Sequence, residues 1–153
     1  MVRIEQYGEK ERQHLLDLPC PTYDTSPFVT GVKVKESRVA LISTAGLHTI
    51  SDRPFGVGES GYRLIPGSSQ ANDLVMSHIS TNFDRTGYQL DLNTVFPLDR
   101  LNEMAEAGSL GSVAEYHYSF MGATDPVQME QEARSLASIL KKDHVDAVLL
   151  VPV

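Results

Sequence analysis

The C-terminal stretch 145–153 constrains the fold more than any other part of the chain. Apart from Asp146 it is apolar and rich in valine, and it follows a stretch with helical spacing over residues 125–142. A short apolar run of this kind predicts a strand buried on both faces, as in a parallel sheet. Ligands of open α/β sheets sit beyond the carboxyl ends of such strands. We therefore expect a functional rim near Val153.

The other predicted elements alternate between strand and helix. The hydrophobic pattern predicts strands over 38–44, 72–78 and 112–121, and helices over 5–18, 97–108 and 125–142. We therefore predict an α/β fold with an open, mainly parallel sheet and helices on both faces, flavodoxin- or Rossmann-like, with its C-terminal part missing. Residues 1–153 would form a single domain. Residues 1–37 supply an N-terminal helix and an extended lead-in, and 38–153 supply an α/β core that is incomplete at its C-terminus.

Local signals mark several boundaries. Pro97 and Pro126 suit the first position of a helix, Asp125 suits an N-cap, and Gly108 suits a C-cap. Residues 48–67 are dense in glycine and proline, which predicts little regular structure and an ordered loop beside the carboxyl edge of the sheet. Within 112–121 the side chains alternate, and this pattern places Tyr116, Tyr118 and Phe120 on one face and Glu115, His117 and Ser119 on the other.

Composition narrows the class of protein. The chain has 153 residues, 41% hydrophobic and 22% charged, with a net charge of -7. Nucleic acid and anionic membranes are disfavoured as partners because both require a basic face. The N-terminus lacks the pattern of a signal peptide and no apolar run is long enough to span a membrane, so we expect a cytoplasmic protein.

The single cysteine, Cys20, leaves two interpretations open. It follows Pro19 and precedes Pro21, so it belongs to a predicted rigid, extended turn. One cysteine allows neither an internal disulfide nor a zinc-binding thiol cluster. Cys20 is either a half-buried spacer, as free cysteines usually are, or a thiol that exchanges with a partner.

Polar residues near the predicted strand ends are the candidates for a site. A carboxylate beside an imidazole fixes its tautomer and raises its basicity, which draws attention to His78 and Asp84. Arg53 and Arg63 are suited to bind a carboxylate, although solvated surface arginines are as plausible. No nucleophile elbow, phosphate loop or metalloprotease motif is present. The full set of candidates is Thr44, Gly46, His48, His78, Asp84, Asp91, Asn93, His117 and Ser119.

A metal site is an alternative for some of these residues. His48, His78, Asp84 and His117 have suitable ligand atoms. Their spacing matches no known metal signature, so we expect no metal. His117 lies in a strand otherwise lined with aromatic residues, where a structural role is more common than a catalytic one.

Several stretches together resemble the glycine/sarcosine/betaine and D-proline reductase selenoprotein B family. They are 39–46, 62–66, 96–101, 111–112, 117–122 and 145–153. Their order and spacing also fit, and the likeness runs from about Leu18 to the end of the chain. The chain looks closest to the short, stand-alone bacterial members of that family.

The resemblance implies that the catalytic atom lies outside the chain. In that family Val-Pro-Val is followed by selenocysteine or cysteine, and then by a further helix and strand. We therefore expect the nucleophile directly after Val153, with UGA read as a stop codon; a deliberately shortened chain and a naturally short protein are the competing accounts. A selenol ionises more readily than a thiol and is nucleophilic at neutral pH.

The resemblance also implies partners and binding residues. The full reductases cleave a C–N bond of a substrate held on the pyruvoyl group of a partner subunit, and thioredoxin-like thiols regenerate the selenol. Matching positions suggest that Thr44, Ala45, Gly46, His117, Ser119, Met121 and Gly122 line the substrate pocket, and residue chemistry adds His48, His78 and Asp84. Residues 58–63 are less aromatic than in the amino acid reductases, so the substrate stays open.

Three functions remain as alternatives. The first is a selenol- or thiol-dependent oxidoreductase related to the glycine, betaine and D-proline reductases. The second is a non-catalytic domain that binds a small molecule or a partner. The third is a thiol-exchange protein that uses Cys20. An uncovered last strand would in addition favour a homo-oligomer, or aggregation.

Overall fold

Strand β1 (Arg38–Ser43) is the centre of the main sheet in the computed structural model, which describes residues 3–20, 22, 24–81 and 83–153. Strand β7 (Ala147–Val151) pairs with β1 in parallel, from Val39↔Ala147 to Ser43↔Val151. Strands β5 (Ser112–Val113) and β6 (Tyr116–Ser119) pair in parallel with the other edge of β1. Strand β3 (Arg63–Pro66) pairs antiparallel with β6. The predicted α/β class is confirmed.

The predicted strand over 112–121 is interrupted. Between the pairs Val39↔Val113 and Ile42↔Tyr118, β1 advances by three residues (42 − 39) and the stretch that holds β5 and β6 advances by five (118 − 113). That stretch therefore has two extra residues. The imidazole of His117 fills the gap, because its Nδ1 atom accepts a hydrogen bond of 3.0 Å from the backbone N–H of Leu41. A side chain thus replaces the carbonyl that the ladder lacks, and no buried N–H group is left without a partner at this point.

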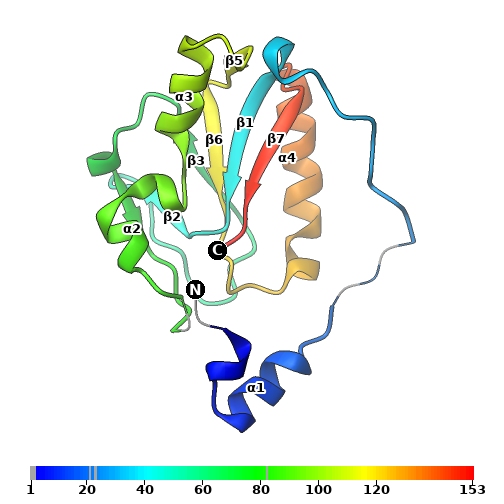
Figure 1. Cartoon of the computed structure of the whole chain (residues 1–153), viewed down its shortest axis with the longest axis vertical. Helices are drawn as coiled ribbons and strands as arrows, with labels where there is room; N and C mark the ends of the chain where they lie inside the picture. The colour runs from blue at the N-terminus through cyan, green and yellow to red at the C-terminus, as the bar shows by residue number, and fades with distance from the viewer. Residues whose placement is uncertain (1–2, 21, 23, 82) are drawn as a thin grey trace.

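Helices α3 (Leu98–Glu106) and α4 (Glu130–Lys142) flank the strands (Figure 1). Successive residues of β1 point to opposite faces of the sheet. Val39 and Leu41 pack with Leu98 and Leu101 in one hydrophobic cluster, whereas Ala40 packs with Leu136 and Leu140 in the other. The two clusters confirm that helices cover both faces. Burying each of these leucine side chains contributes on the order of 2 kcal/mol.

The second predicted strand lies outside the main sheet. Strand β4 (Leu74–Met76) pairs antiparallel with β2 (Leu47–Thr49), which directly follows the end of β1. The stretch 48–67 lacks regular structure over most of its length, as predicted, and its strand residues are the end of β2 and all of β3. Strand β3 escaped detection because it is short and ends in Pro66. The remaining short elements are η3 (Ala71–Asp73), α2 (Thr86–Leu90) and η4 (Leu92–Thr94).

The prediction that the last strand is buried on both faces is wrong. Val148 and Leu149 are each 37% exposed and Leu150 is 67% exposed. Among the described strands β7 pairs only with β1, so its outer edge has no neighbour. The apolar content correctly predicted that this segment forms a strand. It could not predict which faces and edges of the strand other elements would cover.

The helix ends agree with the local signals to within a residue. Pro97 is the N-cap of α3 rather than its first residue, and Gly108 follows the helix with a φ of 68°. The side chain of Asp125 accepts a hydrogen bond from the Val127 N–H group and begins η5 (Pro126–Met129), which continues into α4. The predicted boundaries therefore arise from capping.

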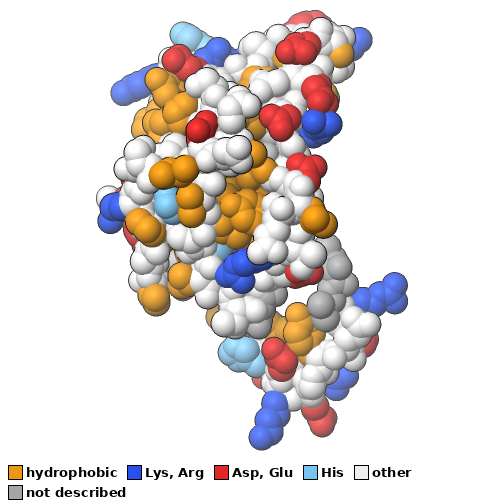
Figure 2. Space-filling model, turned by 90° about the vertical axis from the view of Figure 1, so that its left-hand side faces the viewer, with side chains coloured by type: hydrophobic (Ala, Val, Ile, Leu, Met, Phe, Trp, Pro, Cys, Tyr) orange, Lys and Arg blue, Asp and Glu red, His pale blue; other side chains and the backbone are white. Residues whose placement is uncertain are grey.

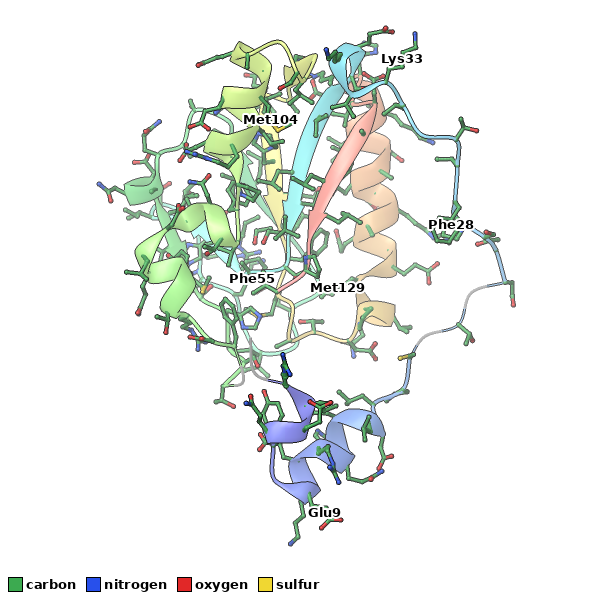
Figure 3. All side chains as sticks on the ribbon, viewed as in Figure 1. Glu9, Phe28, Lys33, Phe55, Met104 and Met129 are labelled. Atoms are coloured by element: carbon green, nitrogen blue, oxygen red, sulfur yellow. The ribbon has the colours of Figure 1, made fainter. Side chains whose placement is uncertain are left out.

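The N-terminal part lies apart from the sheet (Figure 1). The predicted helix over 5–18 is divided into η1 (Ile4–Gln6) and α1 (Glu9–Leu16), and η2 (Val34–Glu36) precedes β1. Phe28 lies on the lead-in between them and is 92% exposed (Figure 3). Cys20 is exposed, so the prediction of a half-buried spacer is wrong. Pro21, part of the predicted turn, lies outside the described residues.

Figure 2 shows hydrophobic side chains near the middle of this face and towards its upper left, with acidic and basic side chains around them. In the part of the chain that the structure describes, every helix is too short or too polar to cross a bilayer.

Candidate functional site

Thr44 joins the carboxyl ends of three strands. Its Oγ1 atom accepts a hydrogen bond of 2.8 Å from the Val153 N–H group and donates one of 3.2 Å to the Val153 carbonyl. Its own carbonyl accepts a hydrogen bond of 2.8 Å from the Gly122 N–H group. Residues that follow β1, β6 and β7 therefore meet at one point, which we call the carboxyl rim.

Gly122 is required by this arrangement. A Cβ atom at this position would lie 2.4 Å from the Val153 carbonyl oxygen and 2.9 Å from the Thr44 carbonyl oxygen. Both neighbours are backbone atoms that the hydrogen bonds around Thr44 hold in place. Only a residue without a side chain lets the three segments approach so closely.

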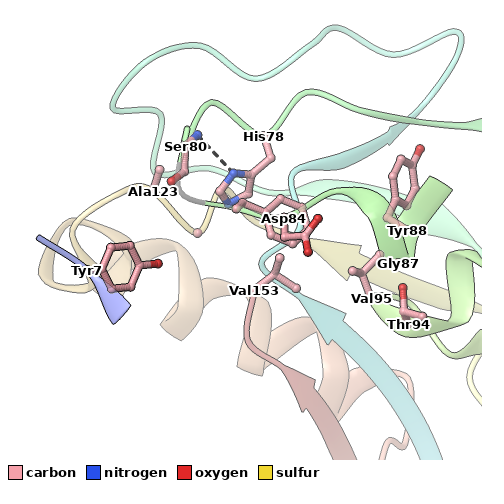
Figure 4. Close-up of a pocket in the computed structure, with 12 residues that line it drawn as sticks. Tyr7, His78, Ser80, Asp84, Gly87, Tyr88, Thr94, Val95, Ala123 and Val153 are labelled. Atoms are coloured by element: carbon pink, nitrogen blue, oxygen red, sulfur yellow. Dashed lines mark hydrogen bonds between the residues drawn. The ribbon is translucent and has the colours of Figure 1, made fainter. Parts of the chain in front are cut away.

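A cleft of about 630 Å³ opens beside the rim (Figure 4). Val153 and Gly122 form part of its wall, and the segment from His78 to α2 forms much of the rest. This is where ligands of open α/β sheets are expected. The complete lining is Tyr7, His78, Ser80, Phe83, Asp84, Gly87, Tyr88, Thr94, Val95, Gly122, Ala123 and Val153.

His78 is positioned by Gly46. Gly46 has a φ of 66°, and a Cβ atom there would lie 3.1 Å from the backbone of His78. The imidazole is buried, and its Nδ1 atom accepts a hydrogen bond of 3.2 Å from the Ser80 N–H group. The neutral ring therefore carries its proton on Nε2, which is buried without a hydrogen-bond partner among the described residues. Burial, and then the charge of Arg85, lowers the pKa of His78.

Arg85 fixes the segment that carries His78. Its guanidinium donates hydrogen bonds to the carbonyls of His78, Ser80 and Phe83. The ring of Phe83 lies 5.0 Å from that of His78, and Arg85 lies 5.6 Å from the Phe83 ring centre. The positive charge of Arg85 is thus directed at carbonyl groups of its own loop.

Asp84 also lines the cleft, but its bonds do not go to His78. Its Oδ1 atom accepts a hydrogen bond of 2.9 Å from the Thr86 N–H group. The bonds to the backbone and side chain of Thr86 lower the pKa of Asp84, so the carboxylate is ionised. The structure brings the predicted pair to one cleft, and the hydrogen bonds described for each side chain go to another partner.

The other predicted site residues lie behind the rim. His117 is fully buried between Leu41 and the ring of Phe96, and burial followed by the charge of Arg38 lowers its pKa to about 4. The hydroxyl of Ser119 accepts a hydrogen bond of 2.9 Å from the Leu47 N–H group. Neither residue lines the cleft.

Four further predicted positions support the rim from within. Ala45 and Met121 are fully buried and form a bridge between the segments after β1 and β6. Gly46 donates its N–H group to the Phe120 carbonyl at 2.8 Å. His48 is buried, and its Nδ1 atom lies 2.8 Å from the Thr49 carbonyl. These residues shape the site without bordering the cleft.

Arg53 and Arg63 bind a carboxylate, but it belongs to the same loop. Each guanidinium lies 2.8 Å from Oε1 of Glu59. Burial opposes ionisation of Glu59, but the hydrogen bonds from Gly56 and Arg63 outweigh it and lower the pKa. The Thr124 hydroxyl donates to the Glu59 carbonyl at 2.9 Å, which ties this loop to the segment after β6. The loop is therefore ordered and tied to the segment after β6, as predicted for an ordered loop, and none of its residues lines the cleft.

Asp91 and Asn93 close a turn rather than a site. The Asp91 carboxylate accepts from the backbone and side-chain N–H groups of Asn93, each at 2.9 Å. In the described ranges no three His, Cys, Asp or Glu side chains gather as a metal ion would require.

The prediction missed several residues that line the cleft. Gly87 and Tyr88 belong to α2, a helix too short to give a periodic signal. Phe83 and Ser80 belong to the polar stretch after β4, which the sequence marks as a loop or a site. Tyr7 approaches the cleft from the N-terminal segment, and no local pattern predicts such a contact.

The chain is similar to subunits of amino acid reductases. It is 33% identical to the D-proline reductase subunit gamma of Acetoanaerobium sticklandii over 121 residues, which cover 77% of this chain and 49% of that protein. It is 28% identical to the glycine reductase complex component B subunit gamma of Symbiobacterium thermophilum, with 92% and 34% covered. For the betaine reductase complex component B subunit beta of Peptoclostridium acidaminophilum the identity is 26%, with 88% and 32% covered.

The chain therefore spans half or less of the curated relatives that it matches. No solved structure matches it significantly. The model of the family described as glycine/sarcosine/betaine reductase selenoprotein B matches residues 9–153. This match covers nearly the whole chain and includes every strand and the entire carboxyl rim. The chain belongs to the glycine/sarcosine/betaine reductase selenoprotein B family.

Proposed function

We propose that this chain is the substrate-holding domain of an amino acid reductase. The observation that carries the proposal is a cleft of about 630 Å³ beside the carboxyl rim, where the residues after β1, β6 and β7 meet and where Gly122, Ala123 and Val153 line the cleft. The relatives named above are subunits of reductases for D-proline, glycine and betaine. Small amino acids of this kind fit a cleft of that size with room for a reacting group from elsewhere.

The reacting group in this proposal is a selenol or thiol directly after Val153. The resemblance noted above puts such a residue after Val-Pro-Val, and Val153 lines the cleft, so a side chain one position further on would stand at the substrate. When present it would supply the nucleophile for reductive cleavage of a C–N bond, with two electrons from a dithiol that becomes a disulfide. Residues of this chain would hold the substrate, and Thr44 would fix the end of β7.

Partner proteins complete the proposal. A pyruvoyl-containing subunit would present the substrate, and a thioredoxin-like protein would return the dithiol. The relatives' names identify them as subunits of complexes, which supports a partner subunit in general. The unpaired edge of β7, with Leu150 67% exposed, favours association with that subunit or with a second copy.

The binding part of the proposal can be tested on this chain. We expect glycine, sarcosine, betaine or D-proline to shift the NMR signals of Gly122 and His78 on titration. Ala123→Trp would fill the mouth of the cleft and abolish those shifts, because Ala123 is an exposed part of its lining. Ala107→Trp, at the exposed end of α3, is the matched control and should leave binding unchanged. Equal binding by the two variants would refute a substrate site in this cleft.

The same β7 edge supports a second candidate, a partner-binding domain without chemistry of its own. An apolar groove of about 290 Å³ lies between β7 and α4, lined in part by Leu150, Val148 and Ala133. Leu150→Lys should then reduce self-association in light scattering or binding of the partner subunit, and leave amino acid binding intact. If Leu150→Lys instead weakens amino acid binding and leaves self-association and partner binding unchanged, the substrate-holding domain is favoured over the partner-binding domain.

A further inference from the structure

The cleft beside the carboxyl rim has one charged side chain among the described residues that line it, that of Asp84. Its carboxylate is exposed, and its hydrogen bonds to Thr86 favour the ionised form. The Oδ1 atom accepts the Thr86 N–H group at 2.9 Å, and a carboxylate has acceptor positions to spare beyond one such bond. A negative group with unused acceptors therefore faces the cleft.

The nearest basic side chains do not neutralise it. Arg85 is directed at three backbone carbonyls, those of His78, Ser80 and Phe83. His78 is buried, and burial together with Arg85 keeps its imidazole uncharged at neutral pH. Asp84 is thus the one described side chain of the lining that carries a full charge, and its carboxylate attracts cations.

Aromatic rings line the same cleft as this carboxylate. Phe83 precedes Asp84 in the chain, and its half-buried ring lines the cleft. Tyr88 lies on α2, and its half-buried ring also lines the cleft (Figure 4). Burial raises the pKa of Tyr88, so its phenol stays protonated. An aromatic face attracts a cation, and quaternary ammonium groups are commonly held by rings together with a carboxylate.

We infer that Asp84, with the rings of Phe83 and Tyr88, forms a subsite for the positively charged nitrogen of a small molecule bound in the cleft. The chemical class of the ligand is an amine, protonated or quaternary. That this amine belongs to an amino acid rests on the proposed function; the subsite itself requires only a cation. The opposite end of the molecule would point towards the rim at Gly122 and Val153.

A structural role of Asp84 can be separated from this one. The carboxylate also closes a turn before α2, and asparagine preserves that acceptor, because its Oδ1 atom takes the place of the carboxylate oxygen. Asp84→Asn therefore removes the charge and keeps the turn. Asp91→Asn is a matched control, since Asp91 closes a similar turn through Asn93 and does not line this cleft.

The experiment is an NMR titration of the chain with tetramethylammonium, with betaine, and with 3,3-dimethylbutyrate, in which carbon replaces the charged nitrogen of betaine. We expect Asp84→Asn to weaken tetramethylammonium and betaine about five-fold, as for a solvent-accessible charge pair, and added salt to weaken them further. Asp91→Asn should leave both affinities unchanged. Binding of 3,3-dimethylbutyrate should be weak and indifferent to Asp84.

Each other outcome decides a different point. Equal binding of tetramethylammonium and of betaine by Asp84→Asn and the unchanged chain overturns the subsite, and the proposed function then stands or falls by the Ala123→Trp test. Binding of tetramethylammonium that depends on Asp84, without binding of any of the four amino acids, leaves the subsite standing and removes the proposed function. If the unchanged chain binds neither tetramethylammonium nor betaine, the subsite is overturned.

Discussion

His117 and His78 are buried histidines with similar bonding and different surroundings. In both rings Nδ1 accepts a backbone N–H group, from Leu41 at 3.0 Å and from Ser80 at 3.2 Å. In both, Nε2 has no partner among the described residues, and burial lowers the pKa. His117 lies between β1 and the interrupted strand, at its hydrogen bond with Leu41, a place that we call the seam. His78 lies on the wall of the cleft. The two histidines therefore differ in location and not in residue chemistry. His117 has a structural role, and His78 is a candidate for a functional one.

The first prediction concerns the carboxyl rim. It borders the cleft, but backbone atoms approach one another closely around Gly122. Gly122→Ala should lower the free energy of unfolding by about 3 kcal/mol, because the new methyl group meets the backbone carbonyl oxygens of Thr44 and Val153. Urea unfolding measures the effect. Gly31→Ala, with no atom near the new Cβ, should stay within about 0.5 kcal/mol. A small loss at Gly122 would show that the rim is loose.

The second prediction concerns the pH dependence that the seam imposes. The pKa of His117 is about 4 in the folded chain, against an ordinary value of 6.5. The unfolded chain therefore takes up this proton first as pH falls, so stability is complete above about pH 6.5 and declines towards pH 4. Between pH 7 and 4.5 the loss should be roughly 2 kcal/mol.

Variants assign that loss to one histidine. His117→Asn removes the titrating group and should flatten most of the decline in urea unfolding measured at several pH values. His78→Asn should retain it, although the lowered pKa of His78 acts in the same direction. An unchanged pH profile in His117→Asn would contradict the pKa and the comparison drawn from it.

The third prediction tests what His117 does in the seam. His117→Phe keeps an aromatic ring but removes the acceptor, so the Leu41 N–H group is buried without a partner. Such a loss costs about 1.5 kcal/mol. His117→Asn can retain the bond through Oδ1 and should be more stable than His117→Phe at pH 7. Hydrogen exchange of the Leu41 amide gives a second, local measurement, and equal protection in both variants would argue against the bond.

The fourth and smallest effect is expected at Thr44. Thr44→Val keeps the shape of the side chain and removes both hydrogen bonds to Val153. The residue is half-buried, so the loss should be about 1 kcal/mol, with faster hydrogen exchange at Val153. Thr30→Val, on the exposed lead-in, is the control. No change at Thr44 would mean that strand pairing alone holds the end of β7.

Hydrophobic spacing predicts a helix or strand well where the signal lies within that one segment of the chain. The amphipathic stretch over 125–142 became η5 and α4, and the apolar run after Arg38 became β1. Spacing fails where coverage depends on distant parts of the chain. The stretch 145–153 has the composition of an interior strand, but only β1 lies beside β7, and Leu150 is exposed.

The candidate site divides in the same way. Their position near a predicted strand end marked Thr44 and Gly46, and the family resemblance added Gly122. Each has a close backbone contact that explains it. The polar stretch after β4 marked His78 and Asp84, which line the cleft. Alternation placed His117 and Ser119 on the correct face, but it could not tell that α3 and β2 close that face off from the cleft. Tyr7 had no local signal at all.

The interruption between β5 and β6 has one further consequence. An even number of added residues conserves the parity of a strand, so Ala114 and Tyr118 still point towards α4, as they would without the insertion. A single added residue would have inverted every later side chain and turned Phe120 towards α3. A dislocation of this kind leaves no trace in the alternating pattern, and it changes the length of a strand without changing which layer each side chain enters.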